Sequence, residues 1–186
     1  MSALTRRKVA LAFVCTALPT RTLAYFIPPF GMRCSSGWSV TGYYTATEEE
    51  FSGQPTAIEI DGVHYRFPAD FLRWVKTDGW AMTRDGWFLG WNKSWRRGNA
   101  PLNSRGKPLQ VGGIAVDSRL VPLGTLMRIP DLPSPWGDKV FIADDTGGGV
   151  VGKRLDIYCG SGPEQRVEAL RLTSSNMNAC FDESGT

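Results

Sequence analysis

Residues 112–130 read GGIAVDSRLVPLGTLMRIP, and residues 139–158 read KVFIADDTGGGVVGKRLDIY. Asp117, Asp145 and Asp156 each stand at or beside the end of a short apolar run that has the character of a β-strand. Two of these runs are followed by glycine-containing turns, which let a ligand approach the backbone closely. Carboxylates at strand ends beside such turns are how a β-scaffold presents acid/base groups to a substrate, so this stretch predicts an enzyme.

Outward from this stretch, the chain predicts hairpins and two short helices. Residues 38–45 (WSVTGYYT) are rich in aromatic and β-branched side chains and predict a first strand. Asp-Gly turns predict one hairpin over 56–67 and another over 80–91. A proline at its start and an apolar face predict a helix over 68–76, and a second short helix is expected over 166–172.

Further strands are expected in the second half of the chain, at 113–117, 125–129, 139–143 and 155–158. Residues 92–108 carry several basic side chains and predict an exposed loop. With 186 residues and 42% hydrophobic content, the chain can bury one sound core and predicts a single domain. Many short strands with one or two small helices predict a mainly β fold, a compact barrel.

The N-terminus has the pattern of a secretory signal. Basic residues at 6–8 precede an apolar run at 9–18, and small residues at 22–24 favour a cut there. The apolar run is too short to span a bilayer as a stable helix. An uncleaved anchor and a lipoprotein at Cys15 are the alternatives, although bulky residues precede that cysteine.

The expected organisation is a signal peptide at 1–24, a linker at 25–37, the barrel at 38–175 and a C-terminal tail at 176–186. Loss of the signal removes four basic residues and no acidic one, which changes the formal net charge from +3 to −1. A nucleic-acid partner therefore loses its main support. A secreted protein of the cell envelope, in the periplasm or cell wall and without a stable membrane span, is expected instead.

The cysteines fit export, because oxidising compartments permit disulfides. The mature chain keeps Cys34, Cys159 and Cys180, and either Cys159 or Cys34 could pair with Cys180. A zinc site has little support, because His64 is the only histidine and no Cys-x-x-Cys pair exists. Neither a metal nor another cofactor is expected.

Residues 115–125 (AVDSRLVPLGT) and 143–158 (ADDTGGGVVGKRLDIY) resemble the 3D domain, named for three aspartates, of lytic transglycosylases. This family includes membrane-bound lytic transglycosylase A, whose first-strand motif resembles residues 40–45, and small stationary-phase muralytic proteins, whose insert resembles residues 71–91. The resemblance implies a six-stranded double-psi β-barrel. The large second domain that builds one wall of the substrate groove in the bigger enzymes is not expected.

The resemblance also implies an activity, non-hydrolytic cleavage of the MurNAc–GlcNAc bond in peptidoglycan glycan strands to give 1,6-anhydro ends. In that scheme Asp156 is the catalytic acid and then the base, and Asp145 assists it. Asp156 must start protonated, although an ordinary aspartate has a pKa near 3.9. Desolvation by apolar neighbours and repulsion from Asp145 are expected to raise its pKa.

Thr41 and Tyr43 share one face of their strand and are candidate substrate-binding residues, with core packing as the alternative. Gly147 and Gly148 could offer backbone N–H groups to a sugar or simply form the turn. Asp117 is included with them as a residue that orients the site, but a structural role in holding the loop that follows it is favoured. The neighbouring Asp144 is left out, because strand alternation directs it away from Asp145.

Three other functions remain open. An inverting hydrolase on the same barrel would use Asp117 or Asp145 as its base. A non-catalytic module would bind the cell wall without cutting it. The sequence Asp145-Thr146-Gly147 also imitates an aspartic protease loop, but that enzyme needs two such loops and only one is present. A homodimer is left open.

Overall fold

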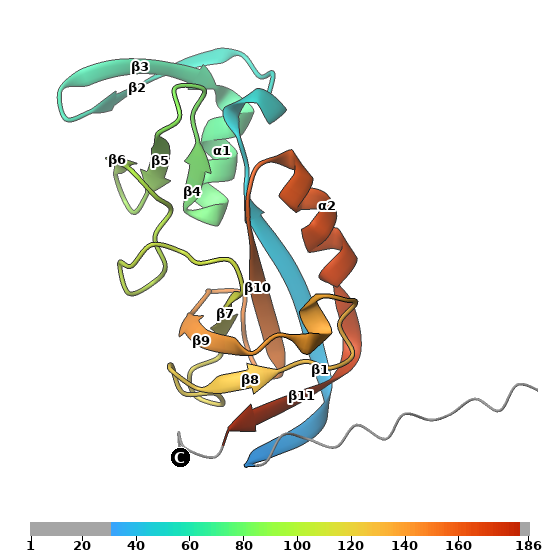
Figure 1. The fold of residues 1–186 in the computed structure, drawn as a ribbon. Helices are drawn as coiled ribbons and strands as arrows, with labels where there is room; N and C mark the ends of the chain where they lie inside the picture. Colours follow the sequence, from blue (N-terminus) through green and yellow to red (C-terminus); the bar gives the residue numbers. More distant parts are fainter. Residues whose placement is uncertain (1–30, 183–186) are drawn as a thin grey trace, which may run out of the picture.

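The computed structural model describes residues 31–182, and the expected signal segment at 1–24 lies outside the described residues. The six barrel strands are β1 (Met32–Thr45), β7 (Gly113–Val116), β8 (Leu126–Arg128), β9 (Phe141–Asp145), β10 (Arg154–Ser161) and β11 (Ser174–Asp182). They close in the order β1-β10-β7-β9-β8-β11 (Figure 1). The β1–β10 and β7–β9 pairs are parallel and the others antiparallel, so the expected six-stranded, mainly β barrel is confirmed.

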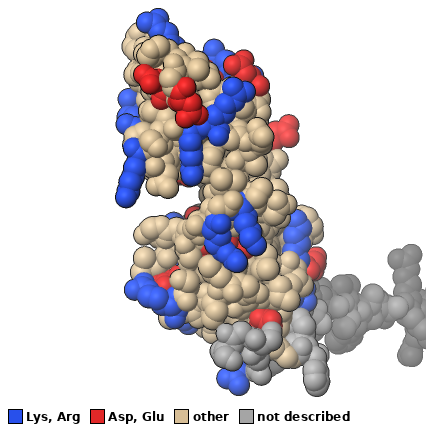
Figure 2. Space-filling view, turned by 90° about the vertical axis from the view of Figure 1, so that its left-hand side faces the viewer, with Lys and Arg blue, Asp and Glu red and all other residues tan. Residues whose placement is uncertain are grey.

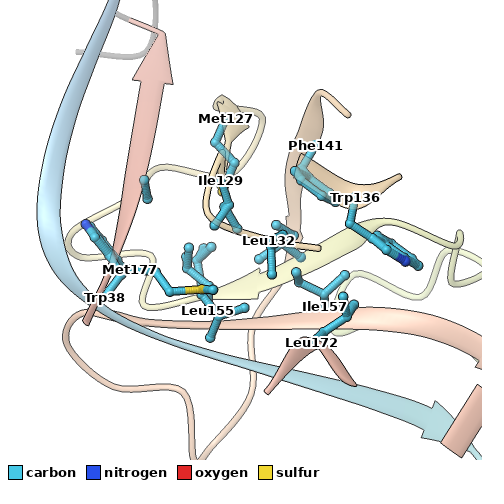
Figure 3. Packing of buried hydrophobic residues seen from close by; sticks show 14 of the residues in the cluster. Trp38, Met127, Ile129, Leu132, Trp136, Phe141, Leu155, Ile157, Leu172 and Met177 are labelled. Atoms are coloured by element: carbon cyan, nitrogen blue, oxygen red, sulfur yellow. The ribbon is translucent and has the colours of Figure 1, made fainter. Parts of the chain in front are cut away.

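Apolar side chains from alternate strand positions fill this barrel (Figure 3). Leu155 and Ile157 of β10 are fully buried, and Trp38 and Met177 close one side of the same cluster. Helix α2 (Pro163–Leu172) packs on β1 and β10, and the 3-10 helix η2 (Trp136–Asp138) covers the core between β8 and β9. Alternation along β10 therefore turns its other face, with Asp156, away from the core.

Strand β11 and the start of β1 extend the barrel beyond the expected boundaries. Residues 32–37, expected as linker, belong to β1, and residues 176–182, expected as tail, belong to β11. These segments pair with each other in register, and a disulfide joins Cys34 to Cys180 directly across the two strands. Of the two pairings left open by the sequence, this one forms, and Cys159 stays a buried thiol whose burial raises its pKa to about 12.

The chain between β1 and β7 leaves the barrel and forms a second, smaller lobe (Figure 1). Its elements are η1 (Glu48–Glu50), β2 (Pro55–Ile60), β3 (Val63–Pro68), α1 (Ala69–Asp78), β4 (Trp80–Met82), β5 (Phe88–Trp91) and β6 (Trp95–Gly98). The β2–β3 turn uses Asp61 and Gly62 at positive φ, as an Asp-Gly hairpin requires. Both predicted hairpins and the predicted helix are thus present.

This inserted lobe has its own buried cluster, centred on Phe71, Leu89 and Trp87. The prediction of an exposed loop over residues 92–108 is wrong for its first part, because β6 pairs with β5 and completes a three-stranded sheet. The guanidinium of Arg97 stacks on Trp87, and that of Arg96 stacks on Trp80. These cation–π contacts with tryptophans explain why a basic segment could join a sheet.

Candidate active site

A cleft runs between the barrel and the inserted lobe, and Figure 2 shows the notch, with Lys and Arg side chains along its rims. Residues from β1, α1, β4, β7, β9 and β10 line it together with two loops. A smaller lobe thus provides an opposing wall that the sequence did not predict. The cleft is lined by Tyr43, Tyr44, Thr45, Thr77, Asp78, Trp80, Leu102, Leu109, Ala115, Asp145, Thr146, Gly147, Gly148, Gly149, Val150, Arg154 and Asp156.

Asp156, the third residue of β10, lines this cleft. Its carboxylate Oδ1 accepts a hydrogen bond of 2.8 Å from the Thr41 hydroxyl on the paired strand β1. Burial raises the pKa of Asp156 and the negative charge of Asp145 adds to this, while the Thr41 hydrogen bond and the charge of Arg154 lower it; the net shift is upward. The sequence predicted this upward shift of the Asp156 pKa, and it predicted both causes that raise the pKa, burial and the charge of Asp145.

Asp145 ends β9 and lines the same cleft. Its carboxylate accepts hydrogen bonds of 2.7 Å from the backbone N–H groups of Ser104 and Thr146. A register shift between β7 and β9 leaves Asp144 out of the ladder, so Asp145 rather than Asp144 pairs with Ala115. Asp144 is absent from the cleft lining, in keeping with its exclusion from the candidate site, but the local cause is this β-bulge.

The loop over residues 101–109 is fastened to the end of β9. The buried Asn103 side chain donates to the Asp144 carbonyl at 3.0 Å and accepts from the N–H groups of Arg105 and Lys107. The Ser104 hydroxyl accepts from the N–H of Thr146 at 3.1 Å. Asp145 therefore has a structural task in addition to any chemical one, since it holds this loop against the cleft.

Strand β1 supplies the wall beside Asp156. Tyr43 lines the cleft and its ring contacts that of Tyr158 with centroids 5.1 Å apart. The Tyr158 hydroxyl is hydrogen bonded to Thr45 at 2.9 Å. Burial, followed by the charges of Asp145 and Asp156, raises the pKa of Tyr43, so this phenol stays neutral and can donate a hydrogen bond. Tyr43 thus lines the cleft, whereas Thr41 is absent from the cleft lining and contacts the candidate site through its hydrogen bond to Asp156.

Gly147, Gly148 and Gly149 form an exposed turn directly after Asp145, and all three line the cleft. Space around Gly148 and Gly149 is open, since a Cβ atom there would meet no heavy atom within 4 Å. The N–H of Val150 donates to the Gly147 carbonyl and closes the turn. The two readings of these glycines, as turn formers and as a surface that a sugar can approach, are compatible.

Asp117 lies outside the cleft lining. Its buried carboxylate accepts hydrogen bonds from the Arg119 N–H and guanidinium and, at 2.8 Å, from the N–H of Gly152. The Arg119 hydrogen bonds, followed by that of Gly152, hold the pKa of Asp117 well below its usual range. This geometry is that of an anchor for the turn that precedes β10, and not of a group facing a substrate.

Sequence reasoning missed two charged residues of the cleft. Asp78 is the last residue of α1 and faces the cleft from the inserted lobe; burial and then the charge of Asp156 raise its pKa. Arg154 opens β10, two residues before Asp156. The strand alternation of β10 could have identified Arg154, whereas Asp78 depends on a lobe packing that no local pattern signals.

Within residues 31–182, no group of three or more His, Cys, Asp or Glu side chains is arranged to hold a metal ion. None of the helices in that range is long and apolar enough to cross a membrane. A second hollow, lined mainly by apolar residues that include Trp38, Leu120 and Phe181, contains none of the candidate site residues.

Residues 112–171 match the family model of the 3D domain. The fold over most of the chain is similar to that of MltA from Escherichia coli, a lytic transglycosylase, with a TM-score of 0.55 and 13% identity over 82% of this chain and 76% of that chain. A structure of E. coli MltA with bound chitohexaose matches with a TM-score of 0.55 and 14% identity, over 82% and 72% of the two chains.

The membrane-bound lytic murein transglycosylase from Agrobacterium tumefaciens is also similar, with a TM-score of 0.52 and 14% identity over 77% of this chain and 73% of that chain. No curated protein sequence matches the chain. At these identities the structural likeness concerns the fold. The chain therefore has a closed, MltA-like β-barrel, and its residues 112–171, which contain strands β7 to β10, match the 3D domain.

Proposed function

We propose that the protein is a peptidoglycan lytic transglycosylase that cleaves the β-1,4 bond between N-acetylmuramic acid and N-acetylglucosamine without using water. The observation that carries this proposal is the setting of Asp156, a carboxyl group that lines the cleft and has a raised pKa. The 3D-domain match and the MltA-like fold support it. A carboxyl that keeps its proton closer to neutral pH is the group that general acid catalysis needs.

In the proposed reaction, Asp156 donates its proton to the glycosidic oxygen, and the bond between that oxygen and C1 of the muramic acid breaks. The C6 hydroxyl oxygen of the same muramic acid then bonds to C1, and the carboxylate of Asp156 takes the hydroxyl proton. The products are a 1,6-anhydro end and a free 4-hydroxyl, and Asp156 is protonated again. One carboxyl serves twice because the nucleophile is internal, unlike in hydrolysis.

The neighbouring residues have distinct proposed roles. Thr41 orients the Asp156 carboxyl through its hydrogen bond, and the neutral phenol of Tyr43 offers a donor to a sugar. Gly147 and Gly148 let a sugar lie against the backbone. Asp145 raises the pKa of Asp156 by its charge while holding the loop at Ser104.

A second candidate is an inverting hydrolase, because Asp78 brings another carboxylate to the cleft from the opposite lobe. Such enzymes place two carboxyl groups about 6.5–9.5 Å apart, with a water between them. Asp117 no longer suits the role of base, since Arg119 and Gly152 occupy its carboxylate. In this alternative Asp78 or Asp145 would activate the water.

The experiment is mass spectrometry of peptidoglycan digested with the protein, with the Asp156→Asn variant beside it. Anhydro-muropeptides that are absent with the variant are the expected result. Reducing-end products, heavier by one water, would establish the hydrolase instead. Binding without any cleavage would make the protein a wall-binding module, and full cleavage by Asp156→Asn would refute the mechanism.

We also propose that the protein works outside the cytoplasm, in the cell envelope. The disulfide between Cys34 and Cys180 fits an oxidising compartment. A fusion of residues 1–31 to a reporter that is active only after export would test this, and a reporter retained in the cytoplasm would contradict it.

A further inference from the structure

Arg154 is a charged residue of the cleft that the proposed reaction does not use. It begins β10 and lines the cleft, two residues before Asp156 on the same strand. Side chains two positions apart in a strand share a face, and their Cα atoms are roughly 6–7 Å apart. Arg154 therefore stands next to the proposed acid at a separation comparable with the length of a sugar ring.

The guanidinium of Arg154 lacks a hydrogen-bond partner among the described residues. Its Nε is fully buried, and no acceptor within residues 31–182 reaches it. A buried donor without an acceptor is costly. Arg96 and Trp74 also have such a buried nitrogen, but of these three residues only Arg154 lines the cleft.

Three of the carboxylates on and around β10 already accept hydrogen bonds from other donors. Asp117 accepts from Arg119 and Gly152, and Asp145 accepts from Ser104 and Thr146. Asp156 accepts from Thr41, and its interaction with Arg154 is one of charge without a hydrogen bond. A guanidinium in a cleft lining whose N–H groups donate no hydrogen bond within the protein is suited to bind a carboxylate of a ligand.

The backbone holds Arg154 firmly in this position. Its N–H donates to the Gly152 carbonyl at 2.8 Å, and the N–H of Gly152 donates to Asp117 at 2.8 Å. The Asp117–Arg119 ion pair fixes that carboxylate in turn. The anchor around Asp117 thus sets the start of β10 and the direction in which Arg154 enters the cleft.

We infer that Arg154 binds a carboxylate on the muramic acid residue beside the scissile bond, and that it thereby favours acid-bearing glycan over a neutral chito-oligosaccharide. The inference rests on the proposed function, because it concerns the substrate of the same cleft. In peptidoglycan strands only the muramic acid carries an acidic substituent, either its own lactyl carboxylate or the carboxylates of an attached peptide. By binding this carboxylate, Arg154 would also determine which of the two alternating sugars lies next to Asp156.

The same contact assists the proposed acid. The positive charge of Arg154 opposes the upward shift that burial gives the pKa of Asp156. A substrate carboxylate paired with Arg154 cancels that charge, so the bound substrate itself favours the protonated form of Asp156. Binding of the acid-bearing sugar and protonation of Asp156 are thereby coupled.

The test measures binding in an Asp156→Asn background, in which the ligands stay uncut. Three probes of similar length are compared: chitohexaose, which is neutral; peptide-free glycan strands, which have free lactyl carboxylates; and strands that keep their peptides. Addition of Arg154→Gln should raise the Kd for the peptide-free strands about tenfold and change that for chitohexaose less than twofold. Lys153→Gln, which neutralises the exposed neighbouring residue, should change neither by more than twofold.

An equal rise in the Kd of all three ligands would overturn the inference, because it would indicate that Arg154 has a structural role. An unchanged Kd for all three would overturn it as well. A loss of affinity confined to the peptide-bearing strands would show that Arg154 binds a carboxylate of the peptide. Should Arg154→Gln fail to fold, Arg154→Lys is used, which keeps the positive charge but lacks the paired N–H donors of the guanidinium. An intermediate loss of affinity, confined to the acid-bearing strands, is then expected. Selective binding by a protein that cuts no glycan would leave this inference standing and defeat the proposed reaction.

Discussion

The turn around Asp117 and the cleft around Asp156 give the same side chain two opposite electrostatic environments. Asp117 directly follows β7, whereas Asp156 lies on the neighbouring antiparallel strand β10, where it pairs with Ala115 of β7. Asp117 accepts hydrogen bonds from Arg119 and Gly152, and its pKa falls. Asp156 accepts a hydrogen bond from one hydroxyl donor, and burial raises its pKa. The number of donors around a buried carboxyl thus separates an anchor from a candidate acid.

The largest contrast between these regions is expected in activity. Asp156→Asn removes the proton that the proposed reaction transfers, so kcat should fall by about 10³ or more. Asp117→Asn keeps the cleft residues and should retain kcat within about tenfold. The release rate of anhydro-muropeptides from purified peptidoglycan measures both. A loss of equal size in the two variants would show that the anchor and the acid are not separable.

A smaller effect is expected at Asp145, which combines features of both regions. Asp145→Ala removes the acceptor for the N–H groups of Ser104 and Thr146 as well as a negative charge, and kcat should fall about 10- to 100-fold. Asp145→Asn keeps a carbonyl oxygen for those donors and is the matched control. Recovery of most of the activity in Asp145→Asn would assign the loss to the loop, whereas equal losses would assign it to the charge.

The two regions should also differ in how they affect stability. Asp117 has a lowered folded-state pKa, so its contribution is present above about pH 4 and is lost as pH falls through that lowered value. Asp156 has a raised folded-state pKa, so folding is penalised above that value and the penalty disappears below about pH 4.

At neutral pH the Tm of Asp117→Asn should therefore be lower than that of the wild type by several degrees, and the Tm of Asp156→Asn should be higher by a few degrees. Both differences should shrink as the pH approaches 3. Thermal melts followed by circular dichroism at several pH values provide the measurement. Shifts of the same sign at pH 7 would refute the contrast.

The barrel could be predicted from the sequence because its signals are local. Apolar runs ended by glycine turns predicted the strands at or beside which Asp145 and Asp156 stand, and strand alternation predicted that Thr41 and Tyr43 share a face, of which Tyr43 lines the cleft. Strand β11 was not predicted, because Ser174–Asp182 begins with three polar residues and has only Met177 and Phe181 as large apolar side chains. Its pairing with β1 and the Cys34–Cys180 disulfide hold it in the barrel. The sequence did not predict Asp78 as a cleft residue either, because its place in the cleft depends on how the inserted lobe packs against the barrel.

The finest test of the comparison is the single hydrogen bond that Thr41 gives to Asp156. Thr41→Val removes a donor that stabilises the ionised carboxylate, so the pKa of Asp156 should rise further. Because the proposed acid acts in its protonated form, the alkaline limb of the kcat/KM profile should move to higher pH, with a change of only a few fold at the optimum. Thr41→Ser keeps the hydroxyl and should leave the limb in place. A limb that moves to lower pH in Thr41→Val would contradict this assignment, because it would mean that the hydroxyl stabilises the protonated form of Asp156.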